Sequence, residues 1–469
     1  MPSTELRRPN SSDYETLAEL LLEGKLLTST ESIERYSRDE STRAEALPWA
    51  VVLPSSEEEV KKVLSWANEG PFPIVTRGAG TGVAGGSVAL AGGVVLSLER
   101  LDKIISVDTE NLTATCQPGV ITETLQRQVE ELGLFYPPDP ASADTCSIGG
   151  NVAVGAGGAR AVKYGTTRDY VLGMRVALAD GRLIELGGKN VKDASGFSLL
   201  QLMVGTEGTL GVITEVTLRL IAKPKRRVSL LIPFLDLGDA ARLVHEVTLA
   251  GILPAVAEFI DEVAIEASAK HLSRELPCED KARAYSFICL DGDEADALER
   301  QMVSIGEMAK KHNALDVLAA IDEGQQERLW ESRRTLGTAM KGLSPVIGKA
   351  DVVVPRGAVP ELVARIKRIG RALSIDIACF GHAGDGNVHV NILRRDRSEE
   401  SWDTLLDKAM SETMSVVKEL GGRPSGEHGI GALKRAELER FIGADALELM
   451  RGIKDVFDPR GILNPGKVI

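Results

Sequence analysis

Residues 77–87, RGAGTGVAGGS, begin at the last residue of the β-rich run PIVTR at residues 73–77. Gly80, Gly82 and Gly85 satisfy the G-x-G-x-x-G spacing of a Rossmann dinucleotide site. Only eight residues separate Gly85 from Val94, too few for the helix that a Rossmann unit requires. A P-loop is excluded because no Gly-Lys-Ser/Thr follows. The stretch predicts a loop whose backbone N–H groups converge on a pyrophosphate, because glycines permit positive φ and close approach. The alternative, a mobile surface loop, would rarely hold so many glycines between two apolar strands.

Two strands and one capped helix are predicted before this loop. WAVVLP at residues 49–54 and PFPIVTR at residues 71–77 are typical of strands. SSEEEVKKVLSWANEG at residues 55–70 is typical of a helix, with serine at its start, early glutamates and a closing glycine. Valine- and isoleucine-rich runs then alternate with glycine clusters. We therefore expect one compact α+β domain over residues 46–223.

The rest of the chain divides into three further segments. Residues 1–45 are predicted to be helical and polar, with a cluster of leucines near one face at Leu17, Leu20, Leu21 and Leu22. From residue 224 to residue 420, β-rich runs are repeatedly followed by helix-like stretches, which predicts an antiparallel sheet with helices on one face. Residues 421–469 return to glycine and short motifs. The fold class expected for the whole chain is α+β.

Composition excludes several classes of partner. The chain has 469 residues, a net charge of -13 and 4% aromatic residues. This charge would repel a phosphate backbone, so we expect no nucleic acid partner. The five cysteines form no C-x-x-C pair that could bind zinc or an iron–sulfur cluster. Their wide spacing suggests a reducing compartment. Without a signal peptide or an apolar run of about 18 residues, a cytoplasmic location is expected, with peripheral membrane contact left open.

Two more glycine-rich loops complete the pattern. The second runs from PPDP at residues 137–140 through SIGGN at residues 147–151 to Gly157 and Gly158, and the third is GTEGTLGVIT at residues 205–214. Together the three loops resemble the FAD-binding domain of the vanillyl-alcohol oxidase and para-cresol methylhydroxylase superfamily. Within it, the chain resembles the group of D-lactate, glycolate and D-2-hydroxyglutarate dehydrogenases from about Trp49 to the C-terminus.

This resemblance implies a two-part FAD-binding domain, a substrate or cap domain over residues 224–420, and a C-terminal segment that completes the flavin and active site. Some members of the superfamily attach flavin through a histidine in the first or second loop. The first histidine here is His245, so FAD should be held non-covalently. The resemblance assigns FAD binding to Arg77, Gly78, Ala79, Gly80, Thr81, Gly82, Ser87, Pro138, Asp139, Ser147, Gly150, Asn151, Gly157, Gly211, Val212, Ile213 and Asn464.

Three of the six histidines lie in two motifs, HAGDGNVHVN at residues 382–391 and SGEHGIG at residues 425–431. The glycines of the first motif predict a turn, after which Asn387, His389 and Asn391 share one face of a strand. His382 can face His389 across that turn. A carboxylate such as Glu427 would complete a set of two histidines and one carboxylate, which suits Zn²⁺ or another divalent ion.

The resemblance makes His382, His389 and Glu427 the metal ligands beside the flavin, and His428 the substrate-binding residue that acts as base. A divalent cation can lower the pKa of a 2-hydroxyl group and chelate the neighbouring carboxylate. A neutral imidazole can then accept the proton, while hydride passes from C2 to flavin N5. No nicotinamide-binding fingerprint is present, so the electrons should pass to a separate acceptor: an electron-transferring flavoprotein, a quinone or a cytochrome.

The predicted substrate is a D-2-hydroxy acid. Arg334 and Thr338 are one helical turn apart, and Lys349 begins the next strand. In the D-2-hydroxyglutarate branch, residues of these types at this spacing hold the distal carboxylate. The resemblance also places Asn391 at the substrate. The alternative for these residues is an exposed helix with a solvated lysine. A dicarboxylate is the favoured substrate, and D-lactate is the second candidate.

Two other classes of function remain open at this stage. The chain could be the flavin subunit of a larger glycolate-oxidising complex, or an electron-transfer or scaffold protein without a substrate of its own. The intact histidine and glutamate motifs argue against the second alternative. The sequence leaves the metal's identity and a homodimeric assembly open.

Overall fold

The computed structural model describes residues 5–21, 25–41 and 43–469, so Leu22 of the predicted N-terminal cluster lies outside the described residues. The chain divides into two compact units. The first unit comprises residues 1–156, 166–223 and 428–469, and the second comprises residues 157–165 and 224–427. The boundaries predicted at residues 46, 224 and 421 stay predictions.

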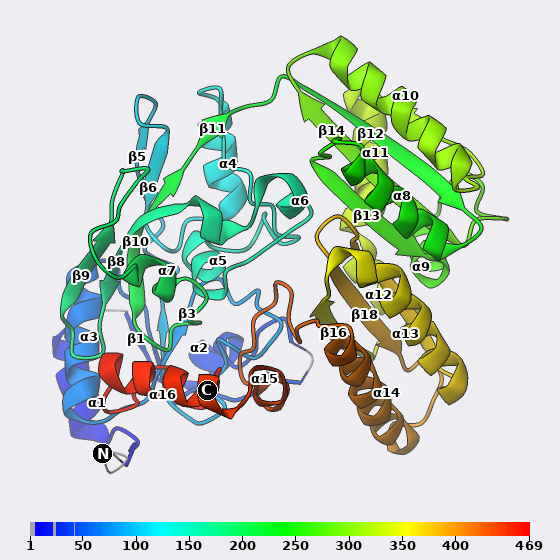
Figure 1. Cartoon of the computed structure of the whole chain (residues 1–469). Helices are drawn as coiled ribbons and strands as arrows, with labels where there is room; N and C mark the ends of the chain where they lie inside the picture. Colours follow the sequence, from blue (N-terminus) through cyan, green and yellow to red (C-terminus); the bar gives the residue numbers. More distant parts are fainter. Residues whose placement is uncertain (1–4, 22–24, 42) are drawn as a thin grey trace. The chain divides into compact units, whose positions relative to one another are not determined.

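The first unit contains a four-stranded sheet in the order β1-β2-β4-β3 (Figure 1). β4 (Val94–Ser97) runs parallel to both β2 (Ala50–Val52) and β3 (Ile74–Arg77), and β1 (Leu26–Leu27) pairs with β2 in the antiparallel sense. No helix lies in residues 78–93, all of which are described, so the rejection of a Rossmann unit is confirmed.

Helix α3 (Glu57–Glu69) covers this sheet because its apolar positions recur at helical spacing. Val60, Val63, Leu64 and Ala67 are buried in the core under the sheet. Ser56 caps the helix by accepting the N–H of Glu59, and Gly70 ends it, as the sequence predicts. Leu17 of α1 (Ser11–Glu19) enters the same core.

A second, antiparallel sheet of the first unit has five strands in the order β5-β6-β10-β8-β9. Its strands are β5 (Ile104–Asp108), β6 (Thr113–Cys116), β10 (Val212–Arg219), β8 (Val171–Ala177) and β9 (Leu183–Gly187). β7 (Leu134–Phe135) pairs with β11 (Ile221–Ala222). The remaining helices of this unit are α2 (Thr30–Ile33), α4 (Thr122–Glu130), α5 (Ile148–Val154), α7 (Leu199–Met203), α15 (Arg435–Ile442) and α16 (Ala444–Phe457), with 3₁₀ turns at Glu34–Tyr36 and Thr167–Tyr170.

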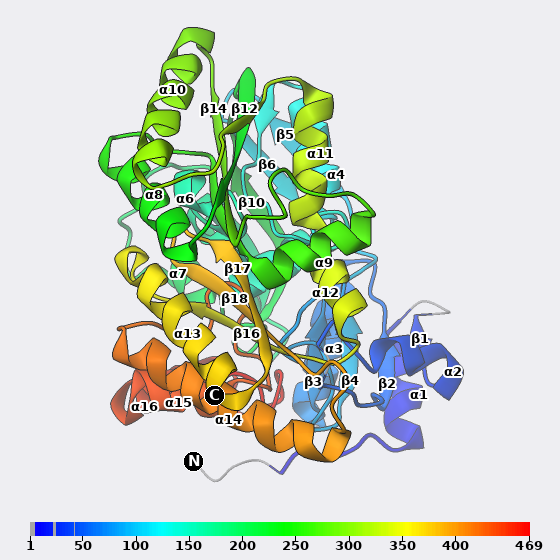
Figure 2. The same cartoon turned by 90° about the vertical axis from the view of Figure 1, so that its right-hand side faces the viewer.

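The second unit is built on a seven-stranded sheet in the order β15-β12-β14-β13-β17-β18-β16 (Figure 2). Its strands are β12 (Arg226–Phe234), β13 (Val256–Asp261), β14 (Ala284–Gly292), β15 (Leu318–Ala320), β16 (Ile347–Val353), β17 (Asp376–His382) and β18 (Asn387–Leu393). All of its strand pairs are antiparallel, as the sequence predicts.

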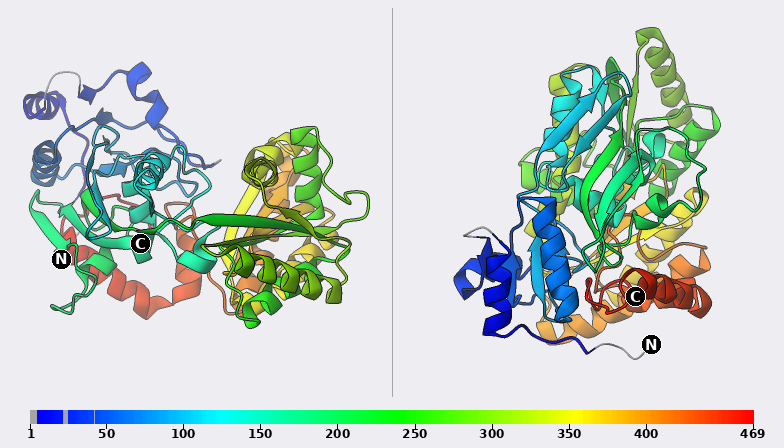
Figure 3. Two further views of the ribbon diagram at one scale, coloured as in Figure 1. Left: turned by 90° about the horizontal axis from the view of Figure 1, so that it is seen from above. Right: turned by 90° about the vertical axis from the view of Figure 1, so that its left-hand side faces the viewer.

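Helices pack on both faces of this sheet (Figure 3, left). One face carries α8 (Leu237–Leu249), α10 (Ala295–Lys311), α13 (Val359–Leu373) and α14 (Glu399–Glu419). The other carries α9 (Glu262–Leu272), α11 (Glu323–Arg334) and α12 (Leu336–Leu343), which the expectation of helices on one face did not include. Neighbouring residues of β12 show the division, because Leu230 packs in one core and Leu231 in the other. Short α6 (Ala161–Tyr164) and a 3₁₀ turn at Arg356–Ala358 complete the unit.

Candidate active site

The three glycine loops come together in the first unit, which holds all of their residues except Gly157 and Gly158. A Cβ atom on Gly78 would overlap Ser147 Oγ, so the first loop touches the second. The third loop lies against α5, which follows the second: the N–H of Gly205 donates to Val152 O at 3.1 Å and that of Glu207 to Ala153 O at 2.7 Å. Three segments that are far apart in the sequence thus form one glycine-rich surface.

The first loop begins where β3 ends. The buried Arg77 guanidinium donates to Arg38 O at 2.7 Å and to Ser87 Oγ at 3.3 Å, which ties the two ends of the loop together. Gly80 has φ +78, and a Cβ there would overlap the guanidinium, so only glycine suits this position. Three further predicted FAD-binding residues lie in the same loop and are partly or fully exposed: Ala79, Thr81 and Gly82.

The second loop places its predicted residues around the start of α5. Ser147 caps this helix by accepting the N–H of Gly150 at 3.3 Å. Asn151 is buried and donates to Thr122 Oγ1 at 2.8 Å. Pro138 accepts a hydrogen bond through its carbonyl from Gln126, and Asp139, next to it, is half-buried.

Asn464 joins the third loop to the end of β3. Its Oδ1 accepts the N–H of Thr76 at 2.9 Å, and its Nδ2 donates to Glu207 O at 2.5 Å. Gly211, Val212 and Ile213 lead into and begin β10. The remaining predicted FAD residue, Gly157, belongs to the second unit, where a Cβ on it would lie 2.9 Å from Glu427 Oε2.

Two buried side chains of the first unit escaped the sequence analysis. The Glu207 carboxylate accepts the N–H groups of Ile430 at 2.7 Å and Gly431 at 2.8 Å, and so fixes the segment that follows His428. Lys467 donates to Gly86 O at 2.8 Å and Val88 O at 2.6 Å at the end of the first loop. Glu207 stands inside the third glycine motif, and that position was the available signal.

In the second unit, β17 and β18 bring the predicted metal ligands together. Phe380 pairs with His389 and His382 with Asn387 across the antiparallel ladder. The two imidazole rings are 5.2 Å apart between centroids. Both predictions, that Asn387, His389 and Asn391 share a strand face and that His382 faces His389, are therefore confirmed.

One oxygen of Glu427 faces both imidazoles. Glu427 Oε1 lies 3.6 Å from His382 Nε2 and 3.4 Å from His389 Nε2. His382 Nε2 is buried and has no hydrogen-bond partner. A buried nitrogen in this state fits a metal ligand, because an unsatisfied polar atom otherwise carries a desolvation cost.

A buried carboxylate stands behind each imidazole. Glu258 of β13 contacts His382 Nδ1, and Asp351 Oδ1 of β16 lies 3.6 Å from His389 Nδ1. Asp351 Oδ2 also accepts hydrogen bonds from Ser425 Oγ at 3.1 Å and from the N–H groups of Gly426 and Glu427, each at 3.0 Å. Asp351 thereby holds the segment that carries Glu427.

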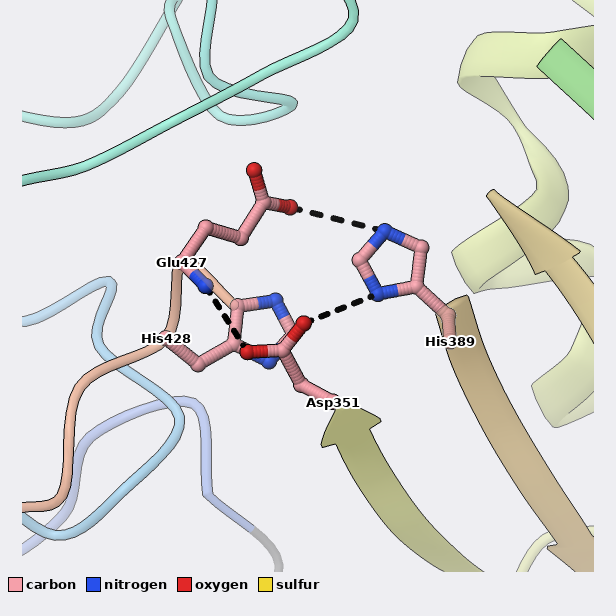
Figure 4. Close-up of side chains that lie close together, drawn as sticks. All are labelled: Asp351, His389, Glu427 and His428. Carbon is pink, nitrogen blue, oxygen red and sulfur yellow. Dashed lines mark hydrogen bonds and ion pairs between the residues drawn. The ribbon is translucent and has the colours of Figure 1, made fainter. Parts of the chain in front are cut away.

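The ligand atoms of Asp351, His389, Glu427 and His428 lie within 4.8 Å of one another (Figure 4). His428 follows Glu427 directly in the chain. Asp351 Oδ1 accepts Asn387 Nδ2 at 2.7 Å, and its other oxygen accepts three donors, so this carboxylate supports the cluster and is a poor candidate ligand. His382, with its unpartnered Nε2, is the better third ligand.

Electrostatics in this cluster are dominated by buried charge. Burial alone would raise the pKa of Glu258, but the charges of Arg333 and His382 outweigh it and lower the pKa to about 2. Burial would lower the pKa of His382, yet Glu258 and Glu427 hold it well above its usual value. The raised pKa of His382 reflects the negative charge of Glu258 and Glu427 around its ring, which would also favour a bound cation.

Four of the predicted substrate residues, Arg334, Thr338, Lys349 and Asn391, belong to the second unit, whereas His428 begins the last segment of the first unit. The structure also distinguishes two neighbouring arginines. Arg334 is exposed at the end of α11 and forms an ion pair with Glu327, whereas Arg333 is half-buried and pairs with Glu258. Lys349 is the register partner of Asn391, so both project from the sheet face that carries His389. Thr338 is exposed on α12, which packs over this face.

Comparison with known proteins identifies the family. Residues 48–187 match the family model described as FAD binding domain, and residues 223–468 match FAD linked oxidases, C-terminal domain.

The chain belongs to the FAD-linked oxidases.

Relatives of this family align over nearly the whole chain. It is 40% identical to glycolate oxidase subunit GlcD of Bacillus subtilis (strain 168), covering 92% of this chain and 91% of the relative. It is 37% identical to D-lactate dehydrogenase of Anaerostipes hadrus, with 95% and 94% covered. It is 34% identical to D-2-hydroxyglutarate dehydrogenase of Stutzerimonas stutzeri (strain A1501), with 96% and 97% covered. The resemblance drawn from the glycine loops is confirmed, and this FAD-linked oxidase is an enzyme.

The fold of this FAD-linked oxidase is that of p-cresol methylhydroxylase. The solved structure of that protein with substrate bound superposes with a TM-score of 0.81 at 18% identity, covering 99% of this chain and 98% of the other. The predicted fold class is therefore confirmed. Among the described residues, every helix is too short or too polar to span a bilayer.

Proposed function

We propose that this FAD-linked oxidase converts a D-2-hydroxy acid to the 2-oxo acid with the help of a divalent metal, and that D-2-hydroxyglutarate is the favoured substrate. One observation carries the proposal: His382 Nε2 and His389 Nε2 face the same oxygen of Glu427, with a buried carboxylate behind each ring. The relatives named glycolate oxidase, D-lactate dehydrogenase and D-2-hydroxyglutarate dehydrogenase support the substrate class.

His382, His389 and Glu427 would hold the metal, and Zn²⁺ is the first choice for two imidazoles and one carboxylate. When bound, the metal lowers the pKa of the 2-hydroxyl group and neutralises the substrate carboxylate. Asp351 keeps the Glu427 segment in place through its hydrogen bonds to Gly426 and Glu427. The role of this chain is thus to present three ligand atoms from two strands and one loop.

His428 would act as the base. A neutral imidazole near neutral pH can accept the proton of the 2-hydroxyl group at a ring nitrogen. Its position is set on one side by the Asp351 bonds to residues 425–427 and on the other by the Glu207 bonds to residues 430 and 431.

The glycine loops of the first unit would hold FAD non-covalently, with Arg77 and the first loop at the pyrophosphate. When bound, FAD supplies the acceptor for the hydride from C2. A separate acceptor, either an electron-transferring flavoprotein, a quinone or a cytochrome, would then reoxidise it.

Arg334, Thr338, Lys349 and Asn391 would bind the substrate. Asn391 lies two residues after His389 on β18, and Lys349 is its partner on β16. Both share the sheet face of His389, which places a cation and an amide beside the metal ligands. A cation on this face suits a second carboxylate of the substrate. D-lactate and glycolate are the runner-up substrates, and a role as the flavin subunit of a glycolate-oxidising complex is the second candidate function, favoured by the 40% identity to subunit GlcD.

Anaerobic mixing of the purified protein with a panel of D-2-hydroxy acids tests the proposal. We expect D-2-hydroxyglutarate to bleach the flavin, removal of the metal by a chelator to abolish bleaching, and FAD to stay bound. His389→Ala should behave like the chelated enzyme. Bleaching by glycolate or D-lactate alone would establish the runner-up, and failure of every acid to bleach the flavin would refute the proposed activity of the isolated chain.

A further inference from the structure

Glu258 is a buried carboxylate with two different partners. Its side chain is 0% exposed on β13, in the middle of the sheet of the second unit. Oε2 accepts from Arg333 Nε at 2.5 Å, and Oε1 contacts His382 Nδ1. Arg333 comes from the last turn of α11, so one carboxylate links a helix to two strands.

The hydrogen-bond chemistry determines which nitrogen of His382 is available. An ionised carboxylate only accepts, so Nδ1 must carry the hydrogen that it shares with Glu258. In a neutral ring the lone pair is then on Nε2, the atom that faces Glu427 Oε1 at 3.6 Å. Histidine ligands of metals generally donate their other N–H to such a partner, which sets both tautomer and ring direction.

Arg333 holds the carboxylate in this position. Its side chain is 11% exposed, and its guanidinium lies over the ring of Phe380, 5.5 Å from the centroid. A planar guanidinium can pair with a carboxylate and stack on a ring at the same time, which an ammonium group does less well. Phe380 is the ladder partner of His389, so this support reaches both imidazoles.

The support of the second imidazole is different. Asp351 stands 3.6 Å from His389 Nδ1 and shares its oxygens with Asn387 and the 425–427 segment. Glu258, in contrast, contacts His382 and Arg333. The Nδ1 side of the His382 ring therefore depends on one carboxylate, Glu258.

We infer that Glu258 is a positioning residue that fixes the ring and tautomer of His382 so that Nε2 can bind a divalent metal, and that Arg333 holds Glu258 for this purpose. The inference rests on the proposed function, because it assumes that His382 is a metal ligand. In this role, Glu258 and Arg333 contact neither the metal nor the substrate.

Zinc affinity of the FAD-loaded protein tests the inference, measured by competition with a chromogenic chelator. In Glu258→Gln the amide has one accepting oxygen and one donating NH₂ group. If the NH₂ group points at Arg333, it opposes the donors of the guanidinium. If it points at His382, Nδ1 must accept, and the hydrogen moves to Nε2, the nitrogen that should bind the metal. We expect zinc to bind about 10- to 100-fold more weakly than in wild type. Glu246→Gln is the matched control, because Glu246 pairs with His312 Nε2 at 2.6 Å away from the site, and zinc affinity should not change.

Failure of the inference and failure of the proposed function give different results. If wild type and His389→Ala bind zinc equally poorly, the metal site itself is refuted. If wild type binds zinc tightly, His389→Ala does not, and Glu258→Gln binds like wild type, only the positioning role is overturned. Circular dichroism and FAD content check that each variant is folded.

A measurement on the wild-type protein covers the case in which Glu258→Gln does not fold. With ¹¹³Cd²⁺ in place of zinc and ¹⁵N-labelled histidine, we expect His382 Nε2 to couple to cadmium and Nδ1 to carry a proton. Coupling of cadmium to Nδ1 of His382, or the absence of a proton on Nδ1, would overturn the inference.

Discussion

At the scale of single residues, His428 carries the proposed proton transfer. His428→Ala should slow flavin reduction by about 10²- to 10⁴-fold, the usual contribution of a general base. FAD and zinc contents should stay at wild-type levels, because the proposed ligands are other residues. Anaerobic stopped-flow absorbance measures the rate. His245→Ala, on an exposed position of α8, is the control, and near-normal reduction in His428→Ala would assign the base elsewhere.

Lys349 tests substrate specificity. If it pairs with a distal carboxylate, Lys349→Ala should reduce kcat/KM for D-2-hydroxyglutarate by an amount equivalent to about 1.5 to 3 kcal/mol, the usual value of a charge-assisted hydrogen bond. D-lactate, which has a methyl group at that end, should lose little. Lys270→Ala, an exposed lysine of α9, controls for net charge. Equal losses for both acids would show that Lys349 acts through general electrostatics or structure.

Lys467 predicts a pH dependence of stability. Burial lowers its pKa from 10.5 to about 8, although Asp39 and Glu207 raise it in part. Between these two values the unfolded chain binds more protons than the folded one, so the free energy of unfolding should rise with pH. Below the lower value the cost of the buried charge is present in full.

Lys467→Met should lack this rise. The difference in unfolding free energy between wild type and Lys467→Met should therefore increase across pH 8 to 10.5 in favour of wild type. We expect a change on the order of 1 to 3 kcal/mol. Urea unfolding of FAD-free protein at several pH values measures it, and a difference that does not vary with pH would contradict the assignment.

At the scale of elements, the first glycine loop depends on backbone conformation and on close approach. Gly80 and Gly133 have similar φ values, +78 and +74. A Cβ on Gly80 would overlap the Arg77 guanidinium, while nothing lies within 4 Å of one on Gly133. Both alanine variants should lose about 1 to 2 kcal/mol of stability from the strained φ. Only Gly80→Ala should lower FAD affinity, measured by fluorescence titration, and equal affinities would refute the role of this loop in FAD binding.

Local elements could be predicted well because their signals lie within a few residues. Helix α3 is set by the cap at Ser56, by Gly70 and by its apolar spacing. The face of β18 follows from the alternation of Asn387, His389 and Asn391. The helices on the second face of the large sheet were missed, because a helical pattern does not state which face it will cover.

At the scale of the whole molecule, the chain should release its flavin. The first histidine is His245, so neither of the first two glycine loops offers an imidazole for covalent attachment. Acid precipitation of the yellow protein should leave FAD in the supernatant, identified by its fluorescence and mass. Flavin that stays with the precipitated polypeptide would show attachment through another residue.

The sequence by itself determined the family, the three glycine loops, the two histidine motifs and the facing positions of His382 and His389, since each depends on residues close together in the chain. Only the tertiary structure decided which buried groups support them. Glu258 and His382 are separated by 124 positions, and Glu207 and Ile430 by 223. Glutamates are common and mostly exposed, so a glutamate in the sequence does not by itself indicate a buried supporting role. That role appears only when the sheets and loops bring the residues together. Burial then makes an unpaired charge costly, and the partners that satisfy it define the site.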